Sequence, residues 1–119
     1  MYKADFSTYD IDNGKFNYFN FINSILVESI CECTNFSFSN FWKAHFDNAC
    51  CVSTHFVNTF FNDTHFDNAD LSYSFFNEAR YITSEQLSKA ASLRDIQNLN
   101  PKIEKELKNS NPKLFEDPN

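Results

Sequence analysis

Residues 44–71 read AHFDN ACCVS THFVN TFFND THFDN ADL, and an aromatic residue, Cys or Leu stands at every fifth position. Within this stretch, HFDNAC (45–50) nearly repeats twenty residues later as HFDNAD (65–70). The same phase runs from Phe6 to Tyr81, and all sixteen of these fifth residues are apolar or aromatic. Neither the 3.6-residue period of a helix nor the two-residue alternation of a strand produces a period of five. The pattern therefore predicts a different kind of regular structure.

A second periodic position supports the first. Two residues before each of the sixteen, the chain carries Gly, Ala, Ser or Thr in fourteen cases, and only Tyr9 and Phe19 break the rule. With 42% apolar residues overall, sixteen apolar residues in a row would arise by chance roughly once in a million trials. The repeat is therefore a property of the fold.

The triplets ADF (4–6), TNF (34–36), SNF (39–41) and ADL (69–71) resemble the motif of the pentapeptide-repeat family, a small residue, then Asp or Asn, then Leu or Phe. The resemblance covers about residues 4–83 and implies an all-β solenoid, a right-handed quadrilateral parallel β-helix. Each pentapeptide would form one side, and four sides would make a coil of twenty residues. The central and small residues would point inward and the other three positions outward.

Sorted by side, the sixteen central residues give four columns of a predicted four-coil stack. Side one holds Phe6, Leu26, Phe46 and Phe66; side two Ile11, Cys31, Cys51 and Leu71; side three Phe16, Phe36, Phe56 and Phe76; side four Phe21, Phe41, Phe61 and Tyr81. Five of the six residues that are not Phe fall on sides one and two. An interior of fixed cross-section, filled at close-packed density, would require smaller residues on some sides to offset the Phe rings on the others. Tyr9 and Phe19 either fold over the open end of the first coil or mark an irregular coil.

The five-residue phase stops at Ile82. Residues 1–83 are thus predicted to form the β-helix, and 84–119 a short α-helical C-terminal cap. TSEQ (83–86) has the pattern of a capping box, and Leu87, Ala90 and Ala91 follow at helical spacing. A second helix is predicted to begin at Asn100-Pro101. Two roles for this tail stay open, covering the last coil or joining two copies of the chain.

Charge and hydropathy restrict the classes of partner. The net charge is −6, and residues 1–82 hold ten acidic against four basic residues, whereas residues 83–119 hold six of each. An acidic repeat segment argues against direct binding to nucleic acid or an anionic membrane. The sequence has neither an apolar run of 18 residues nor a signal-peptide pattern. We therefore expect a cytoplasmic protein whose four cysteines stay reduced.

Two groups of side chains carry the chemistry of metal ligands. His45 and Asp47 flank one inward Phe, and His65 and Asp67 flank the next, about 4.8 Å further along the stack. Imidazole and carboxylate groups bind divalent metals, although the more conservative prediction is a solvent-exposed polar ladder. Cys31 and Cys51 are predicted to stack in the core, and the cysteine spacings do not assemble a tetrahedral zinc site. We predict no cofactor.

Outward-facing apolar residues mark a candidate interaction surface on side four and its corner with side three. It consists of Tyr18, Ile22, Phe38, Trp42, Phe60 and Ile82. Apolar patches of a few hundred Å² mark interfaces. Three interpretations stay open: a surface for a partner or a second copy, a surface covered by the tail, or scattered exposure.

These observations favour a non-enzymatic protein-interaction module that presents a rigid, flat-sided surface. Its protein partner is not identified, and a homodimer would form through the C-terminal cap or side four. The alternative comes from the family resemblance, since long members bind DNA gyrase by imitating duplex DNA. The acidic repeat segment fits that alternative, whereas four coils span only about 19 Å.

Overall fold

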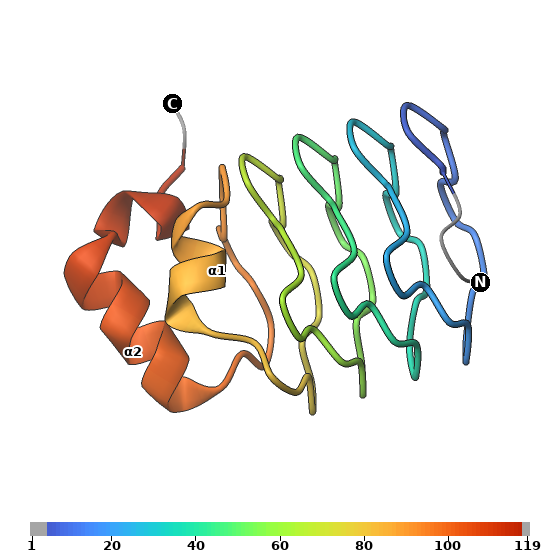
Figure 1. Cartoon of the computed structure of the whole chain (residues 1–119). Helices are drawn as coiled ribbons and strands as arrows, with labels where there is room; N and C mark the ends of the chain where they lie inside the picture. Colours follow the sequence, from blue (N-terminus) through green and yellow to red (C-terminus); the bar gives the residue numbers. More distant parts are fainter. Residues whose placement is uncertain (1–4, 118–119) are drawn as a thin grey trace.

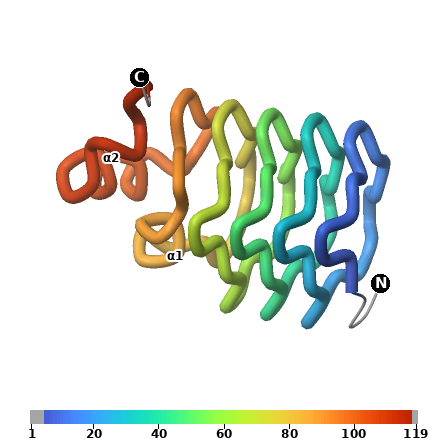
Figure 2. The backbone as a smooth tube through the Cα atoms, turned by 90° about the horizontal axis from the view of Figure 1, so that it is seen from above, coloured from blue at the N-terminus to red at the C-terminus, as the bar shows by residue number. Residues whose placement is uncertain are grey.

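The structure is a computed structural model that describes residues 5–117. The chain winds into a stack of four-sided coils, with the two termini at opposite ends and the helices gathered at the C-terminal end (Figures 1 and 2). It is an all-β solenoid, a quadrilateral parallel β-helix with a helical cap. Ala4, the small residue of the first triplet, lies outside the described residues.

Adjacent coils are joined by parallel bridges in a twenty-residue register. Each side contributes one bridged residue to its neighbour, as in the series Asp5, Ile25, His45 and His65. Two backbone hydrogen bonds form at such a bridge: the N–H of Leu26 donates to His45 O at 2.7 Å, and the N–H of His45 donates to Ser24 O at 3.0 Å. The repeated HFDNA segments therefore lie directly above one another, as the period predicts.

A tight turn closes each corner of the coil. The N–H of the small residue donates to the carbonyl of the central residue three positions earlier, as from Ser24 to Phe21 at 2.9 Å. The third residue of each turn has positive φ, at every fifth position from Thr8 to Glu78. Positive φ at this position alone defines a type II turn. None of these residues is Gly, so the corners are built from side-chain-bearing residues in the left-handed region.

The small position faces inward, where space is limited. At Gly14 an added Cβ would collide with the Phe16 ring and approach Ile11 O to 2.9 Å. Serine and threonine at this position are buried, and their hydroxyls donate to core carbonyls, as Thr54 does to Cys31 O and Thr64 to Phe41 O, both at 2.7 Å. Burying a hydroxyl without a partner would cost stability, and these bonds remove that cost.

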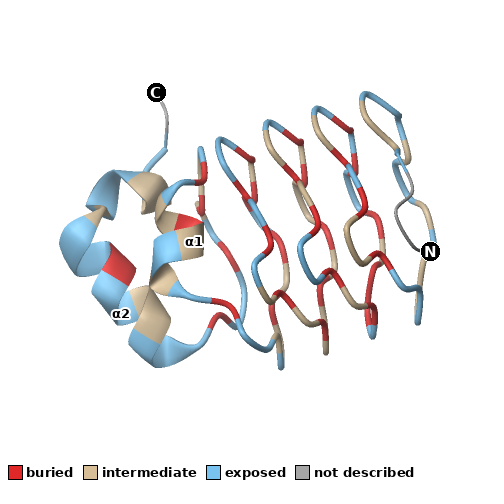
Figure 3. Ribbon diagram, viewed as in Figure 1, coloured by how far each residue is buried: buried red, intermediate tan, exposed pale blue. Residues whose placement is uncertain are grey.

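Phenylalanine rings fill the interior. Within a column, rings stack nearly parallel, with centroids 5.0 Å apart for Phe21 and Phe41 and 5.6 Å for Phe41 and Phe61. Between neighbouring sides they meet edge to face, as Phe36 and Phe41 do at 5.2 Å and 88°. Figure 3 shows buried residues recurring along the coils. The inward columns are thus confirmed from Phe21 to Phe76, all fully or almost fully buried.

The first coil is the open end of the stack. Its central residues Phe6, Ile11 and Phe16 are only partly buried. The Tyr9 ring meets Phe6 edge-on at 5.9 Å, and the Phe19 ring meets Phe16 at 5.5 Å. The two residues that break the small-residue rule therefore lie against the rings of the open coil, while both remain solvent-exposed.

The last corner departs from the predicted columns. Tyr81 was expected inward and Ile82 outward, but Tyr81 is 63% exposed and Ile82 only 8% exposed. The ladder still includes Arg80, whose carbonyl accepts from Phe61 N at 3.0 Å. Tyr81 then adopts φ 63°, two residues earlier than the repeat would place a left-handed residue. This early turn exchanges the directions of the two side chains.

The cap begins with α1 (Ser84–Ser88), which has the predicted capping box between Thr83 and Gln86. The helix is shorter than expected, so that Ala90 and Ala91 lie beyond it, and Ala91 is exposed. The Gln86 amide donates to Phe61 O at 2.8 Å and Thr64 O at 3.0 Å. Helix α1 therefore takes the place that side one of a fifth coil would occupy.

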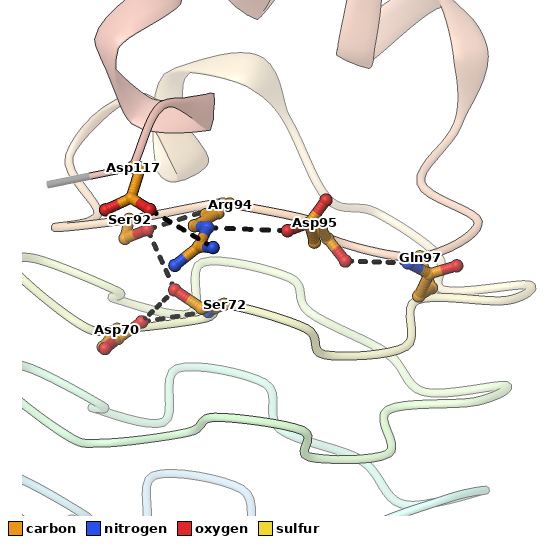
Figure 4. A network of polar contacts seen from close by, with 7 residues as sticks. All are labelled: Asp70, Ser72, Ser92, Arg94, Asp95, Gln97 and Asp117. Atoms are coloured by element: carbon orange, nitrogen blue, oxygen red, sulfur yellow. Dashed lines mark hydrogen bonds and ion pairs between the residues drawn. The ribbon is translucent and has the colours of Figure 1, made fainter. Parts of the chain in front are cut away.

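The repeat resumes after α1, which the expectation of a purely helical tail missed. Ser92 bridges Asp70 and Gln97 bridges Phe75, with a register of 22 residues in place of twenty. Leu93 is completely buried below Leu71, and Ile96 takes a small position. Figure 4 shows the polar contacts that fix this half coil, including Ser72 Oγ to Ser92 Oγ at 2.9 Å.

Two further helices close the C-terminal end. Helix α2 (Pro101–Ser110) is capped by Asn100 with Pro101 in its first turn, as predicted, and Leu107 is its buried residue. The 3₁₀-helix η1 (Pro112–Phe115) follows, and the N–H of Leu93 donates to Leu114 O at 2.7 Å. Arg94 reaches Asp117 at 3.4 Å (Figure 4). The tail therefore packs on the last coil of this chain.

The ring columns predict a gradient of stability along the stack. Phe36→Ala removes a fully buried ring and should lower the free energy of unfolding by about 3–5 kcal/mol. Phe16→Ala, one coil earlier in the same column, should cost about 1–2 kcal/mol because the ring is partly exposed. Urea unfolding followed by the single Trp42 measures both, and equal losses would contradict the assignment of an open end.

The left-handed corners predict a stabilising substitution. Glu28 has φ 58°, and Asn adopts this region more readily than Glu. Asn48 and Asn68 occupy the same position in the next two coils, and Asn68 Nδ2 donates to Asn48 Oδ1 at 2.7 Å. Glu28→Asn should extend this amide ladder and raise stability by about 0.5–1 kcal/mol.

The matched control is Glu32→Asn, which makes the same chemical change in the same coil at a residue without positive φ. This variant should not raise the stability. Thermal unfolding followed by circular dichroism compares the two variants, and an equal shift of Tm in both would attribute the effect to charge alone.

Candidate interaction surface

Five exposed or half-exposed aromatic residues lie on side four and on its corner with side three. This surface, the aromatic edge, consists of Tyr18, Phe38, Trp42, Phe60 and Tyr81. The rings of Tyr18 and Phe38 stack at 4.8 Å and 10°, while 75% and 44% of these residues remain exposed. Trp42 is 43% exposed. The tail leaves these rings uncovered.

Five of the six residues of the predicted surface are exposed or half-buried, and the sixth is buried. Tyr18, Phe38 and Trp42 are exposed, and Ile22 and Phe60 are half-buried. Ile82 does not belong to the surface because it is buried, and Tyr81 takes its place with its ring 6.1 Å from that of Phe60. The sequence signal that could have revealed this exchange is the end of the five-residue phase at the same point.

Cationic side chains lie against two of these rings. Lys43 Nζ is 5.2 Å from the centroid of the Trp42 ring, and the Arg80 guanidinium carbon is 5.8 Å from that of Phe60. Between Trp42 and Phe60, Asn40 and Asn62 complete a hollow of about 260 Å³. The exposed aromatic faces of side four therefore already attract positive charge within the molecule.

A larger groove opens where side four meets α1. It has a volume of about 730 Å³, and its lining includes Trp42, Asp63, Asp67, Tyr81 and Glu85. The Gln86 side chain, fixed by its bonds to two core carbonyls, also contributes. The residue pattern did not predict this groove because it depends on α1 and on the outward turn of Tyr81.

The histidine and aspartate side chains form the expected ladder. The His45 and His65 rings stack at 4.7 Å and 10°, and His45 Nδ1 lies 3.9 Å from Asp47 Oδ1. Asp67 is exposed beside them. Among residues 5–117, no three His, Cys, Asp or Glu side chains converge at metal-binding distance. The four candidate ligands therefore line a surface in this structure without enclosing a common point.

Comparison with solved structures identifies the fold. A pentapeptide-repeat protein from Nostoc superimposes with a TM-score of 0.62 at 12% identity, over 68% of this chain and 67% of that one. The chain has the fold of a pentapeptide-repeat β-helix. No family model and no curated protein matches the sequence, so the likeness concerns the fold alone.

Two more distant pentapeptide-repeat structures were also found. One is a thylakoid-lumen protein from Arabidopsis thaliana, with a TM-score of 0.43, 19% identity, and coverage of 88% of this chain and 74% of that one. The other is a plasmid-mediated fluoroquinolone resistance protein, with a TM-score of 0.41, 14% identity, and coverage of 80% and 55%. Among residues 5–117, none of the helices has both the length and the apolar composition of a membrane-spanning helix.

The four cysteines of this chain lie in three environments. Cys31 and Cys51 are free thiols, completely buried in the side-two column, and Cys33 is exposed at a corner. Contact with Cys31 and burial raise the pKa of Cys51. Burial, with a smaller contribution from Glu32, raises the pKa of Cys50 to about 11; its Sγ lies 3.4 Å from Glu32 Oε1.

These environments predict an order of thiol modification. The thiolate is the reacting form, and at pH 8 a pKa of about 11 leaves about one Cys50 thiol in a thousand ionised. An aromatic disulfide reagent should therefore modify Cys33 quickly and Cys50 slowly, with the Cys50 rate rising about tenfold per pH unit up to pH 10. Cys31 and Cys51 should react only after unfolding.

Mass spectrometry of partly modified protein assigns each site. Four reactive thiols are expected in denaturant without reductant. Only two reactive thiols would show that Cys31 and Cys51 form a disulfide. Fast reaction of Cys31 or Cys51 in the folded state would contradict their burial.

Proposed function

We propose that this pentapeptide-repeat protein is a non-enzymatic interaction module that binds a protein partner through the aromatic edge. The observation that carries the proposal is the exposure of Tyr18, Phe38 and Trp42 on a backbone held by the bridges of the β-helix. Tryptophan and tyrosine are enriched among the residues that dominate binding energy at protein interfaces. Such residues on a rigid surface lose little conformational freedom when they bind.

The backbone of the aromatic edge supports the proposal further. Tyr18 and Phe38 occupy left-handed corners with φ 64° and 65°, where Asn or Gly would be less strained. Their stacked rings expose apolar surface at a position where stability favours a small polar residue. Residues that break a local rule without a gain in folding are candidates for function.

The interior of the solenoid is filled by side chains, and this favours binding on its outer faces. The columns from Phe21 to Phe76 are filled by side chains with 0–2% exposure, so a ligand meets the outer faces of the solenoid. The partner is either a different protein or a second copy of the chain joined through side four or the C-terminal cap.

Affinity capture with matched variants tests the proposal. The bait is the wild type, the variant Tyr18→Ser/Phe38→Ser/Trp42→Ser, or the control Ile25→Ser/Ile30→Ser, whose residues are 37% and 39% exposed elsewhere on the coils. We expect a protein from a lysate of the source organism to be retained by wild type and control and lost with the edge variant. Light scattering on the same three proteins detects a homodimer, which should be present in the wild type and the control and absent in the edge variant.

Two outcomes would overturn the proposal. One is a monomer that captures the same proteins with and without the aromatic edge. The other is inhibition of DNA gyrase supercoiling that survives the loss of the edge and disappears when acidic residues of the coils are neutralised. The latter would assign the protein to the alternative function, imitation of duplex DNA.

A further inference from the structure

The groove between side four and α1 combines aromatic walls with unpaired negative charge. Trp42 and Tyr81 contribute rings that are 43% and 63% exposed. Asp63, Asp67 and Glu85 contribute exposed carboxylates, and among the described residues none of the three forms an ion pair within 4 Å. Lys89 contributes the one ammonium group of the lining, which also includes the imidazole of His65. Three carboxylates against one ammonium group leave the groove acidic.

The shape and rigidity of the groove suit a side chain or a short peptide. Its volume of about 730 Å³ falls within the range of small-ligand sites. One wall is fixed by the capping box of α1 and by the two hydrogen bonds of the Gln86 amide to core carbonyls. Because this wall is ordered without a ligand, binding requires little reorganisation.

The arrangement of charge favours an extended cation over a metal ion. The His, Asp and Glu side chains of the described residues do not gather three at a time around a point. Carboxylates distributed along a groove match a planar guanidinium, which binds carboxylates through paired N–H donors and also stacks on aromatic faces. Lys43 already lies over Trp42, a ring of the groove itself, and Arg80 lies over the neighbouring Phe60, so the rings of side four accept cations in this way.

We propose that this groove binds an arginine-rich segment of a protein partner, whose guanidinium groups pair with the carboxylates of Asp63, Asp67 and Glu85 along the groove and stack on the rings of Trp42 and Tyr81. The inference rests on the proposed function and narrows it, because it names the chemistry of the partner and places one contact beside α1. Tyr18 and Phe38, the stacked pair of the aromatic edge, are absent from the lining.

A titration with defined peptides tests the groove. The probes are a six-arginine peptide, a six-glutamate peptide and the polyamine spermine, added to the full chain at 20 and 200 mM salt. Trp42 is the single tryptophan and lines the groove, so its fluorescence reports binding there. We expect saturable binding of the arginine peptide that weakens at high salt, and no binding of the glutamate peptide.

Two sets of variants separate the groove from general acidity. Asp63→Asn/Asp67→Asn/Glu85→Gln should weaken arginine-peptide binding by about tenfold or more, and Tyr81→Ala should also weaken it. The matched control Glu28→Gln/Glu78→Gln/Glu116→Gln removes the same charge at exposed residues that do not line the groove, and it should bind as the wild type does. Circular dichroism melting establishes that each variant is folded.

The outcomes are distinguishable. Equal weakening by both triple variants, or no binding of the arginine peptide, would overturn the inference. Binding of spermine as tight as that of the arginine peptide would assign the groove to polyamines and contradict a peptide partner. If the aromatic-edge variant captures the same proteins as the wild type while the arginine peptide still depends on the groove, the proposed function fails and the groove remains an arginine site.

Discussion

The parallel stacking of phenylalanine rings along the axis is the constraint on which the rest of the structure depends. Each side of a coil is joined to the next coil by one bridged residue and its backbone hydrogen bonds, and the rings fill the space that these bridges enclose. Phe36, Phe41 and Phe56 each contact rings of their own coil edge to face and rings of adjacent coils nearly face to face. Edge-to-face and offset contacts are the preferred aromatic geometries. Twenty residues per coil bring the rings into this register, except that Phe56 and Phe76 at the C-terminal end are tilted by 58°.

This interior imposes a cost on the backbone. Four tight corners per coil require positive φ at every fifth residue, and this chain meets the requirement without glycine at those positions. Side chains as different as those of Tyr18, Glu28 and Lys43 adopt the left-handed region. The bridges and the packed rings hold these corners in place. The fold therefore restricts the type of corner residue only weakly, and the function of the outer surface determines it more strongly.

The periodic residues made the fold predictable, whereas the breaks in periodicity did not. Inward columns, coil length and the capping box at Thr83 follow from short-range pattern, and the structure agrees with each. Tyr81 and Ile82 exchanged places because one left-handed residue came two positions early. The half coil at Ser92–Gln97 was missed because α1 shifts its register by two residues. A fixed-period scan cannot register either event, since both depend on tertiary packing at the end of the stack.

The same breaks explain where a ligand site can arise on this molecule. Perfect repetition places similar residues directly above one another, as in the His45–His65 and Tyr18–Phe38 pairs. The resulting faces of the solenoid are flat. A groove needs an element that departs from the repeat. Here α1 replaces one side of a fifth coil and Tyr81 turns outward beside it, so that Trp42 and Asp67 of the regular coils face Glu85 of the cap. The repeat therefore supplies the rigid walls, and the interruption supplies the concavity between them.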